Sequence, residues 1–463
     1  MTVTKIMKTK SKLKGIQWFN LILFGLMGQI AWAVENMYFN TFLYNSVYNG
    51  ASQTAVNGSI DVMDAISRMV AFSAVTAVVT TFIMGVLSDR FNSRKWFISI
   101  GYIIWGIITA CFGFITRDNI ALLFSLQDEV KILTATVVTV IVMDCVMTFM
   151  GSTSNDSAFN AWVTDITDVT NRATTESVLA LMPVFAMGIV MALGGLVGVV
   201  GYPTFFIALG AVVAVCGIIG VFTVKDSREE KKTHEKQNFF AEFIYGFKPS
   251  VVKENKNLYL SLCAMALFNI AYQVFFPYIF IYLQHSMNFT FDKLLAGLTP
   301  KIIVIAAVCV VVLVAAIISL GRLMDKIGKD KFIYLSVILY IAGLVVTGLN
   351  DKSLGGFGIG MLITMAGYGC FMILFGASVR DYTPEDKTGM FQGIRMIFIV
   401  LLPMIIGPVI GKEICKISAI TYTNEYGVVQ SAPGAVMFFA AAAVSVLILI
   451  PVVFLKKGKI QKS

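Results

Sequence analysis

Long apolar segments recur along the whole of this chain, and they limit what it can fold into more than any other feature. Each has the 18 or more mostly apolar residues that an α-helix needs to cross the hydrocarbon core of a bilayer. Charged residues make up only 14% of the 463 residues, whereas soluble domains carry about 25%. The sequence therefore predicts a multispanning helical membrane protein and not a soluble enzyme.

Twelve such segments define the expected transmembrane helices of an all-α membrane protein. They cover residues 17–46, 64–88, 95–116, 131–158, 173–200, 203–224, 258–284, 297–320, 331–349, 355–379, 389–411 and 433–455. Most Lys and Arg residues lie in the two terminal segments and in the connections that follow even-numbered spans. Because cytoplasmic loops carry an excess of basic residues, this bias predicts that both termini lie in the cytoplasm. It also explains the net charge of +9 without a nucleic-acid partner.

A long charged segment, residues 225–257, lies between the sixth and seventh spans. It divides the chain into an expected N-terminal six-helix bundle, residues 1–224, and a C-terminal six-helix bundle, residues 258–463. Duplicated bundles related by an axis along the membrane normal are typical of secondary transporters. The layout therefore favours a transporter.

Two short motifs repeat at matching places in these halves. The stretch "GVLSDRFNSRK" from Gly85 follows the second span of the first half, and "GRLMDKIGKDK" from Gly321 follows the second span of the other. "VTDITDVTNR" from Val163 and "VRDYTPEDK" from Val379 form the second pair. We expect the first pair to form a conformational latch, in which the aspartates face helix ends and bases. Its residues are Gly85, Asp89, Arg90, Arg94, Gly321, Asp325 and Lys326.

The pattern G-x-L-x-D-R-x-x-x-R-K at 85–95 resembles the signature loop of the major facilitator superfamily, and the duplicated layout extends this resemblance over the whole chain. Within that superfamily the chain is similar to the glycoside–pentoside–hexuronide:cation symporters, in particular their sucrose–proton symporter-like branch. The stretches that carry this are "AWAVENMYFNTFL" (31–43), "DSAFNAWVTDITD" (156–168) and "GMFQGIRMIFIVLLP" (389–403).

This resemblance has consequences for the solute and the coupling ion. It implies that Asp156 helps to bind a sugar. The sodium-coupled members carry two aspartates on the second span where this chain has Ala77 and Thr81, so sodium coupling of that type is not expected.

Two carboxyl groups lie near the middle of predicted spans. Glu35 is on the first and Asp144 on the fourth, and neither has a basic residue within one helical turn. An ionisable group in hydrocarbon is costly, at least about 2.5–3.5 kcal/mol, so it usually faces a cavity or a partner. We predict that both residues are candidates for proton coupling; the alternative is a structural hydrogen bond to another span.

Polar and aromatic residues at helical spacing form stripes on the first, fourth and seventh spans, which line the central cavity in the resembling superfamily. Amides and carboxylates bind hydroxyl groups, and aromatic rings cover the apolar face of a sugar ring. The alternative is that these stripes only pack the bundle. The candidate cavity residues are Gln29, Trp32, Asn36, Asn155, Asp156, Asn269, Tyr272, Gln273 and Phe276, with Tyr368 on the tenth span.

These observations predict a proton-coupled symporter of a sugar or related small polar solute, working by alternating access as a monomer in the cell membrane. Its partners are then the solute, the proton and the bilayer. No Walker-type GxxxxGK[ST] motif, CxxC pair or metal-ligand spacing occurs in the sequence, so we expect no nucleotide, metal or other cofactor. The alternatives are an exporter of amphiphiles or drugs, a lysolipid carrier of the same fold, and a membrane sensor.

Overall fold

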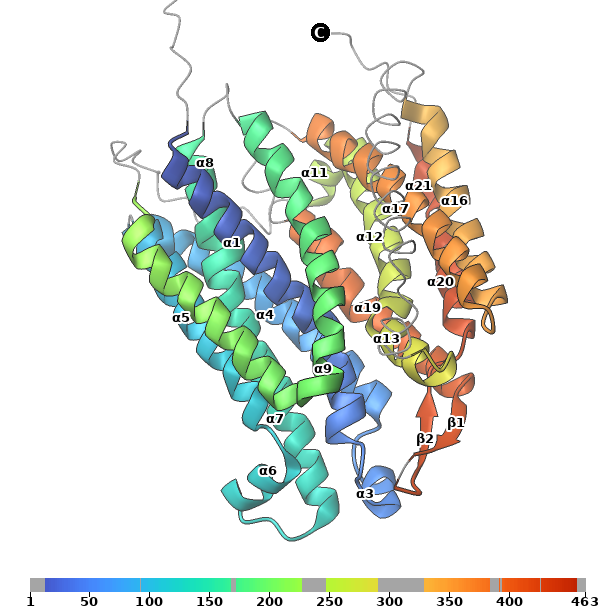
Figure 1. Cartoon of the computed structure of the whole chain (residues 1–463). Helices are drawn as coiled ribbons and strands as arrows, with labels where there is room; N and C mark the ends of the chain where they lie inside the picture. Colours follow the sequence, from blue (N-terminus) through green and yellow to red (C-terminus); the bar gives the residue numbers. More distant parts are fainter. Residues whose placement is uncertain are drawn as a thin grey trace, which may run out of the picture. The chain divides into compact units, whose positions relative to one another are not determined.

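The computed structural model describes residues 13–91, 93–167, 172–226, 247–289, 329–383, 391, 394–424 and 426–455 (Figure 1). The chain forms two compact units. Unit 1 comprises Met1–Phe42 and Thr76–Lys232, and unit 2 comprises Leu43–Val75 and Thr233–Ser463. The predicted division into bundles 1–224 and 258–463, with 225–257 as a linker, stays a prediction.

Ten helical segments in the described part of the chain are long and apolar enough to cross a membrane. They are Gly15–Val47, Val62–Gly85, Arg94–Phe114, Glu129–Ile166, Val197–Thr223, Lys256–Ser286, Phe332–Leu349, Leu354–Gly376, Ile394–Ile417 and Val436–Phe454. This confirms the all-α membrane fold. The predicted eighth span, 297–320, lies outside the described residues.

The predicted fifth and sixth spans lie on one continuous element, α9 (Arg172–Thr223), which contains a sharp break. Gly201 has φ +74° and ψ 163°, a conformation that glycine adopts without a steric penalty. The break falls between the predicted ends at 200 and 203. The two spans are therefore separate helices that meet at this glycine.

Unit 1 is built from helices that approach each other through small residues. A Cβ atom at Gly106 would overlap the backbone of Gly210 and Ala214, and one at Gly217 would overlap Ser99. Close backbone approach of this kind drives helix association in lipid. The elements are α1 (Gly15–Val34), η1 (Glu35–Phe39), α2 (Asn40–Phe42), the second part of α4 (Val62–Phe91), α5 (Arg94–Cys111), η3 (Phe112–Phe114), α6 (Arg117–Leu123), α7 (Glu129–Gly151), η4 (Ser152–Phe159), α8 (Asn160–Ile166) and α9.

Unit 2 uses the same packing. Gly343 and Gly360 let α16 and α17 approach so closely that added Cβ atoms would overlap Thr364 and Thr347. Its elements are η2 (Leu43–Val47), α3 (Gln53–Gly58), the start of α4, α11 (Pro249–Glu254), α12 (Lys256–Phe275), η5 (Phe276–Tyr278), α13 (Ile279–Ile281), η6 (Tyr282–Ser286), α16 (Lys329–Leu349), α17 (Leu354–Tyr382), η8 (Ile397–Leu401), α19 (Leu402–Ile417), β1 (Ile420–Thr423), β2 (Val429–Ala432), α20 (Val436–Val446) and α21 (Leu449–Phe454).

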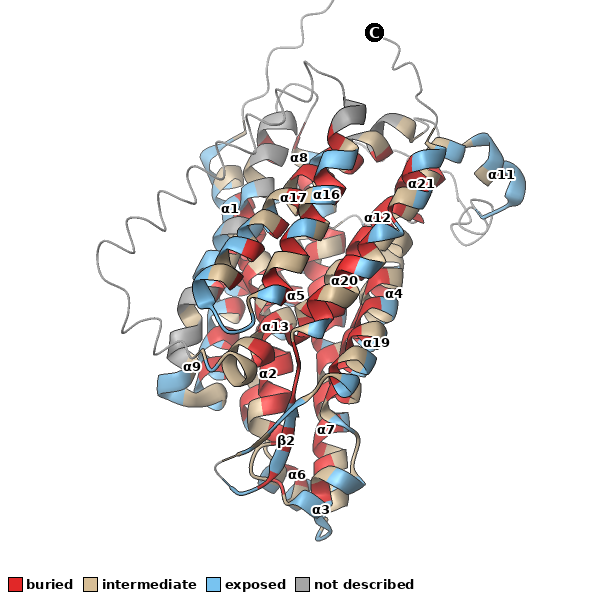
Figure 2. Cartoon of the chain, turned by 90° about the vertical axis from the view of Figure 1, so that its right-hand side faces the viewer, coloured by how far each residue is buried: buried red, intermediate tan, exposed pale blue. Residues whose placement is uncertain are grey.

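The two short strands were not predicted from the sequence. β1 and β2 pair antiparallel between α19 and α20, with Ile420 opposite Ala432 and Thr423 opposite Val429. The long helices carry a buried face and an exposed face (Figure 2). Many of the exposed side chains are large and apolar, such as Phe72, Ile107 and Ile338. Such faces suit contact with lipid.

Candidate transport site

A buried carboxyl group joins the first and fourth predicted spans inside unit 1. Glu35 is the first residue of η1 and only 6% exposed. The Thr148 hydroxyl, on α7, donates a hydrogen bond to Glu35 Oε1 over 3.0 Å. Asp144, one turn before Thr148 on the same helix, is 2% exposed. The two proton-coupling candidates are therefore both buried, and Thr148 connects the helix of one to the carboxylate of the other.

Asp156 and Trp32 lie in contact in the same unit. The Ser152 hydroxyl donates to Asp156 Oδ2 over 3.0 Å, and the Trp32 side chain is a further hydrogen-bond partner of this carboxylate. The Trp32 ring also lies 5.3 Å from that of Trp105, measured between centroids. Asp156 is only half-buried. A carboxylate beside an indole plane is an arrangement that can bind a hydroxylated ring.

Asn155, the residue before Asp156, holds helices together. Its amide nitrogen donates to Tyr102 Oη over 2.6 Å and to the Phe24 carbonyl over 3.3 Å. A Cβ atom at Gly28 would overlap this amide. Asn155 therefore has partners on α1 and α5, and its role as a cavity residue stays a prediction.

The other polar residues of the first span lie one turn apart along the helix. Asn36 Nδ2 donates to the Trp32 carbonyl over 2.7 Å, and Asn40 Nδ2 donates to the Asn36 carbonyl over 2.9 Å. Gln29 is half-buried one turn before Trp32. The side-chain amides of Asn36 and Asn40 are thus each bonded to the backbone of the preceding turn.

The candidates of unit 2 lie on α12, η5 and α17. The rings of Tyr272 and Phe276 stack at 4.6 Å, and the Tyr368 ring lies 5.4 Å from Tyr272. Asn269 is 8% exposed, and its amide nitrogen has no hydrogen-bond partner among the described residues. Gln273 packs against α19, where a Cβ at Gly407 would overlap it. Unit 2 therefore offers an aromatic plane and one buried amide.

Five π-helical segments occur in the part of the chain that the structure describes, and none of them was predicted from the residues. They are η1, η2, η4, η6 and η8, on the predicted first, fourth, seventh and eleventh spans. π-helical turns make up well under 1% of residues in soluble proteins, and they are frequent at functional sites. Glu35 and Asp156 both lie in such segments, which marks the same two spans independently of their polar stripes.

The signature loop, residues 85–95, is held by contacts inside unit 1. Arg94 Nε lies 3.1 Å from Asp165 Oδ2, and the Arg94 guanidinium also donates to Ser88 Oγ. Asp165 belongs to the second repeated motif, so the two motifs of this half touch. The side chains of Asp89 and Arg90, and the whole of Gly321, Asp325 and Lys326, lie outside the described residues. The latch role of these five residues stays a prediction.

A second acid holds this loop, and sequence reasoning missed it. Asp226, just after α9, accepts hydrogen bonds from Arg94 N over 2.7 Å, Lys95 N over 2.8 Å and Ser93 Oγ over 3.1 Å. It therefore satisfies free backbone N–H groups in the first turn of α5. Its position at the start of the charged segment 225–257 gave no signal, because the cap lies more than a hundred residues away in the sequence.

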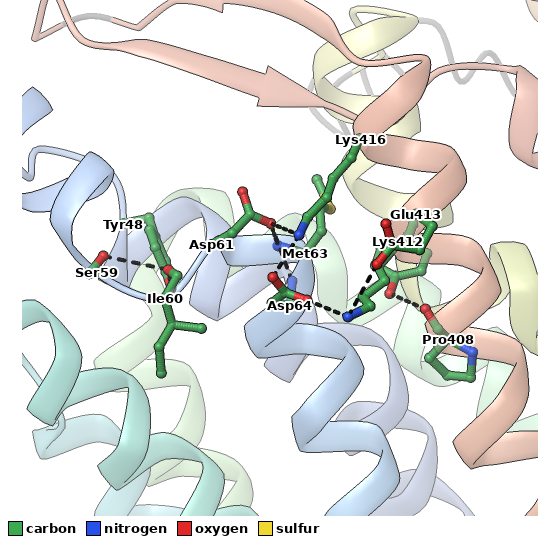
Figure 3. A network of polar contacts seen from close by, with 11 residues as sticks. Tyr48, Ser59, Ile60, Asp61, Met63, Asp64, Pro408, Lys412, Glu413 and Lys416 are labelled. Atoms are coloured by element: carbon green, nitrogen blue, oxygen red, sulfur yellow. Dashed lines mark hydrogen bonds and ion pairs between the residues drawn. The ribbon is translucent and has the colours of Figure 1, made fainter.

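Unit 2 contains an ion-pair network that sequence reasoning also missed (Figure 3). Asp64 lies in the first turn of α4, and its two oxygens contact Lys412 Nζ at 2.5 Å and Lys416 Nζ at 2.6 Å. The two lysines are four residues apart on α19, so they share one helix face. That spacing was the available signal, but the sequence could not name the acid that faces it.

Within the described residues, no group of three or more His, Cys, Asp or Glu side chains is placed to hold a metal ion. The candidate residues of each unit can instead contact a solute through hydrogen bonds from their polar groups and through the faces of their aromatic rings.

The sequence of the chain matches a known family. The family model of the Major Facilitator Superfamily matches residues 18–408 and 302–462, and the chain belongs to this superfamily. It is a secondary transporter and not an enzyme. No curated protein matches the chain.

Solved transporter structures share the fold at low sequence identity. A mutant of the nucleoside transporter NupG has a TM-score of 0.64 at 14% identity, covering 95% of this chain and 99% of that one. The inward-open xylose transporter XylE from E. coli has a TM-score of 0.60 at 13% identity, with coverages of 95% and 97%. An inward-facing, occupied bacterial homologue of the human lysosomal transporter Spinster has a TM-score of 0.59 at 12% identity, with coverages of 96% and 95%.

Proposed function

We propose that this transporter moves a sugar or a related small polar solute together with a proton, by alternating access of two six-helix halves, 1–224 and 258–463. Glu35 is the proposed proton carrier, with Asp144 as the second candidate. The observation that carries the proposal is the burial of Glu35 in a π-helical segment of the first span, in contact with Thr148 of the fourth. A carboxyl at such a place can exchange its proton when the cavity opens to water.

Trp32 and Asp156 support a sugar-like solute, because the carboxylate can accept hydroxyl hydrogen bonds while the indole covers the ring. Within unit 2, Tyr272, Phe276 and the buried amide of Asn269 offer the same two kinds of contact, an aromatic plane and a hydrogen-bonding group. The xylose transporter among the structural neighbours agrees with this class of solute. The glycoside–pentoside–hexuronide branch of the superfamily remains our proposed placement.

A nucleoside is the second candidate solute, because it combines a sugar with a flat base that can stack on the Tyr272–Phe276 pair. The nucleoside transporter NupG is one of the structural neighbours. We further propose that the protein works as a monomer in the cell membrane with both termini in the cytoplasm, as the distribution of Lys and Arg indicates.

Reconstitution into proteoliposomes tests the function. Purified protein is given a panel of sugars, nucleosides and lysolipids while a trapped pH dye reports proton entry. We expect one sugar or nucleoside to enter together with protons, without a requirement for sodium. Movement of lysolipid alone, or solute entry that depends on sodium and leaves the dye unchanged, would contradict the proposal.

The variant Glu35→Gln tests the proton carrier. It keeps the size of the side chain and can still accept the Thr148 hydrogen bond, but it cannot release a proton. We expect it to lose accumulation against a gradient and to keep exchange of solute down its gradient. Asp118→Asn, an exposed acid on α6, is the matched control and should behave as the unchanged protein. Uphill accumulation by Glu35→Gln would show that Glu35 is structural.

A further inference from the structure

We propose that Asp64, Lys412 and Lys416 form a charged gate that holds the first turn of α4 against α19 and separates whenever the transporter opens on that side. We call these three residues the distal gate, because the chain reaches them only after its first crossing through α1. The inference rests on the transport function that the superfamily gives, and it does not depend on which solute or ion is carried.

The geometry of the gate is that of one acid shared by two bases. Asp64 Oδ1 contacts Lys412 Nζ, and Asp64 Oδ2 contacts Lys416 Nζ, at 2.5 and 2.6 Å (Figure 3). The side chains of Asp64 and Lys412 are 18% and 21% exposed. Water therefore screens these contacts only in part, and charge-assisted hydrogen bonds of this kind are stronger than neutral ones.

Asp61 fixes the position from which Asp64 acts. Its Oδ1 accepts hydrogen bonds from Met63 N over 2.9 Å and from Asp64 N over 3.3 Å, which caps the start of α4. Its own distance to Lys416 Nζ is 3.9 Å, longer than either contact of Asp64. Asp61 is therefore a positioning residue with little share in the ion pair, and it serves as the control for the charge of Asp64.

Within unit 2, neutral hydrogen bonds also join the N-terminal part of the sequence to its C-terminal part. Segment 43–53 supplies one partner of each bond, and the other comes from η6 or from the segment that carries β1 and β2. The bonds join Tyr44 Oη to the Ser431 carbonyl (2.7 Å), Asn45 Nδ2 to Gln284 Oε1 (2.7 Å), Asn45 Oδ1 to His285 Nε2 (2.7 Å), Asn424 Nδ2 to Asn49 Oδ1 (3.0 Å) and Val429 N to Gln53 Oε1 (3.0 Å).

These bonds connect the N-terminal part of the sequence to its C-terminal part through side-chain contacts that water can replace. The net gain of a neutral hydrogen bond over its hydrated partners is small. These hydrogen bonds can therefore open at modest cost, and the ion pair supplies the larger bias towards the closed state.

When the gate opens, Asp64 and Lys412 can still be stabilised by water or by another charged group. Asp64 lies at the end of its helix, where water can solvate it. Lys412 keeps a second acid, because its Nζ lies 3.4 Å from Glu413 Oε1 and that side chain is 57% exposed. When the gate opens, Lys412 can therefore keep an acidic partner, and no charge is left unpaired in hydrocarbon, where it would be costly.

Distance measurement by electron spin resonance tests the gate without any solute. Spin labels at position 54 on α3 and position 426 beyond β1 replace two exposed residues, Thr54 and Tyr426, on the two segments that the neutral hydrogen bonds join. The full-length chain, with its native cysteines replaced, is reconstituted in lipid. Asp64→Asn keeps the shape of the side chain and removes its charge. We expect the ratio of long to short distances to rise about tenfold, as loss of one charge-assisted bond implies.

The control variants distinguish a gate, which opens during transport, from a contact that only stabilises the fold. Asp61→Asn keeps the helix cap and should leave the distances unchanged. Lys412→Gln with Lys416→Gln should lengthen them as Asp64→Asn does, and the reversed set Asp64→Lys with Lys412→Glu and Lys416→Glu should restore the short distance. Unchanged distances in Asp64→Asn, or loss of both neutralised variants from the membrane, would overturn the gate. Absence of uptake with a working gate would instead count against the proposed symport alone.

Discussion

Acidic side chains hold the chain at both ends of α4, yet these contacts differ in how far they reach along the sequence. In its first turn, Asp64 pairs with lysines that lie 348 and 352 positions later in the sequence. Beyond its last turn, the signature loop is held by Asp165 and Asp226, which contact Arg94 from only 71 and 132 positions later. At 1.5 Å per residue, the 30 residues of α4 span about 45 Å.

This difference suggests different tasks for the two ends. The contacts of the signature loop all lie within the proposed N-terminal half, residues 1–224 apart from Asp226 just after it, and they have no reason to break during transport. A contact between the two parts of the sequence must break if those parts move apart. We therefore expect charge changes at Asp64 to alter the population of states, and changes around the signature loop to alter the stability of unit 1.

Reversing one charge at each end gives the largest expected contrast. Asp64→Lys places a third ammonium group beside two others, and like charges about 4 Å apart repel by roughly 4 kcal/mol at an effective dielectric constant of 20. We expect the distance between labels at 54 and 426 to become almost entirely long. Asp165→Lys, the matched reversal beside Arg94, should leave that distance distribution as it is. Equal lengthening by both variants would erase the distinction between the two ends.

Removing the acid that caps α5 should have a moderate effect on stability. Asp226→Ala leaves the N–H groups of Arg94 and Lys95 without their acceptor, a loss of about 1–2 kcal/mol. We expect thermal unfolding in detergent to begin several degrees lower, with no change in the distance between labels at 54 and 426. Asp226→Asn keeps one acceptor oxygen and should lose less. A lengthened distance in Asp226→Ala would mean that the loop also controls the distal gate.

The ion pair between the two motifs of unit 1 should show the smallest effect. The Asp165 side chain is 39% exposed, and pairs of this kind contribute about 0.2–1 kcal/mol. A double-mutant cycle with Arg94→Gln and Asp165→Asn, read by thermal unfolding, should give a coupling energy in that range. A coupling above about 2 kcal/mol would show that the pair is a main support of the bundle.

The candidate site could be predicted only in part. Trp32 and Asp156 were predicted as cavity residues on different spans, and the structure brings them into contact. Asn155 was predicted as a cavity residue on the fourth span, but its amide donates hydrogen bonds to Tyr102 and Phe24. A helical wheel gives the face of a residue to within about one position, and adjacent residues on a π-helical turn can point to quite different neighbours. Their binding roles remain predictions.

The sequence by itself determined the membrane class, the places of the described spans, the break near Gly201 and the repeated loops. These are local properties, because a helix in hydrocarbon must satisfy its own backbone and its length can be read from consecutive apolar residues. Only the tertiary structure decided that Asp64 meets Lys412, that Thr148 meets Glu35 and that Asp226 caps α5. Such pairs depend on how each helix is rotated and shifted against its neighbours, and the packing of many small residues sets that rotation.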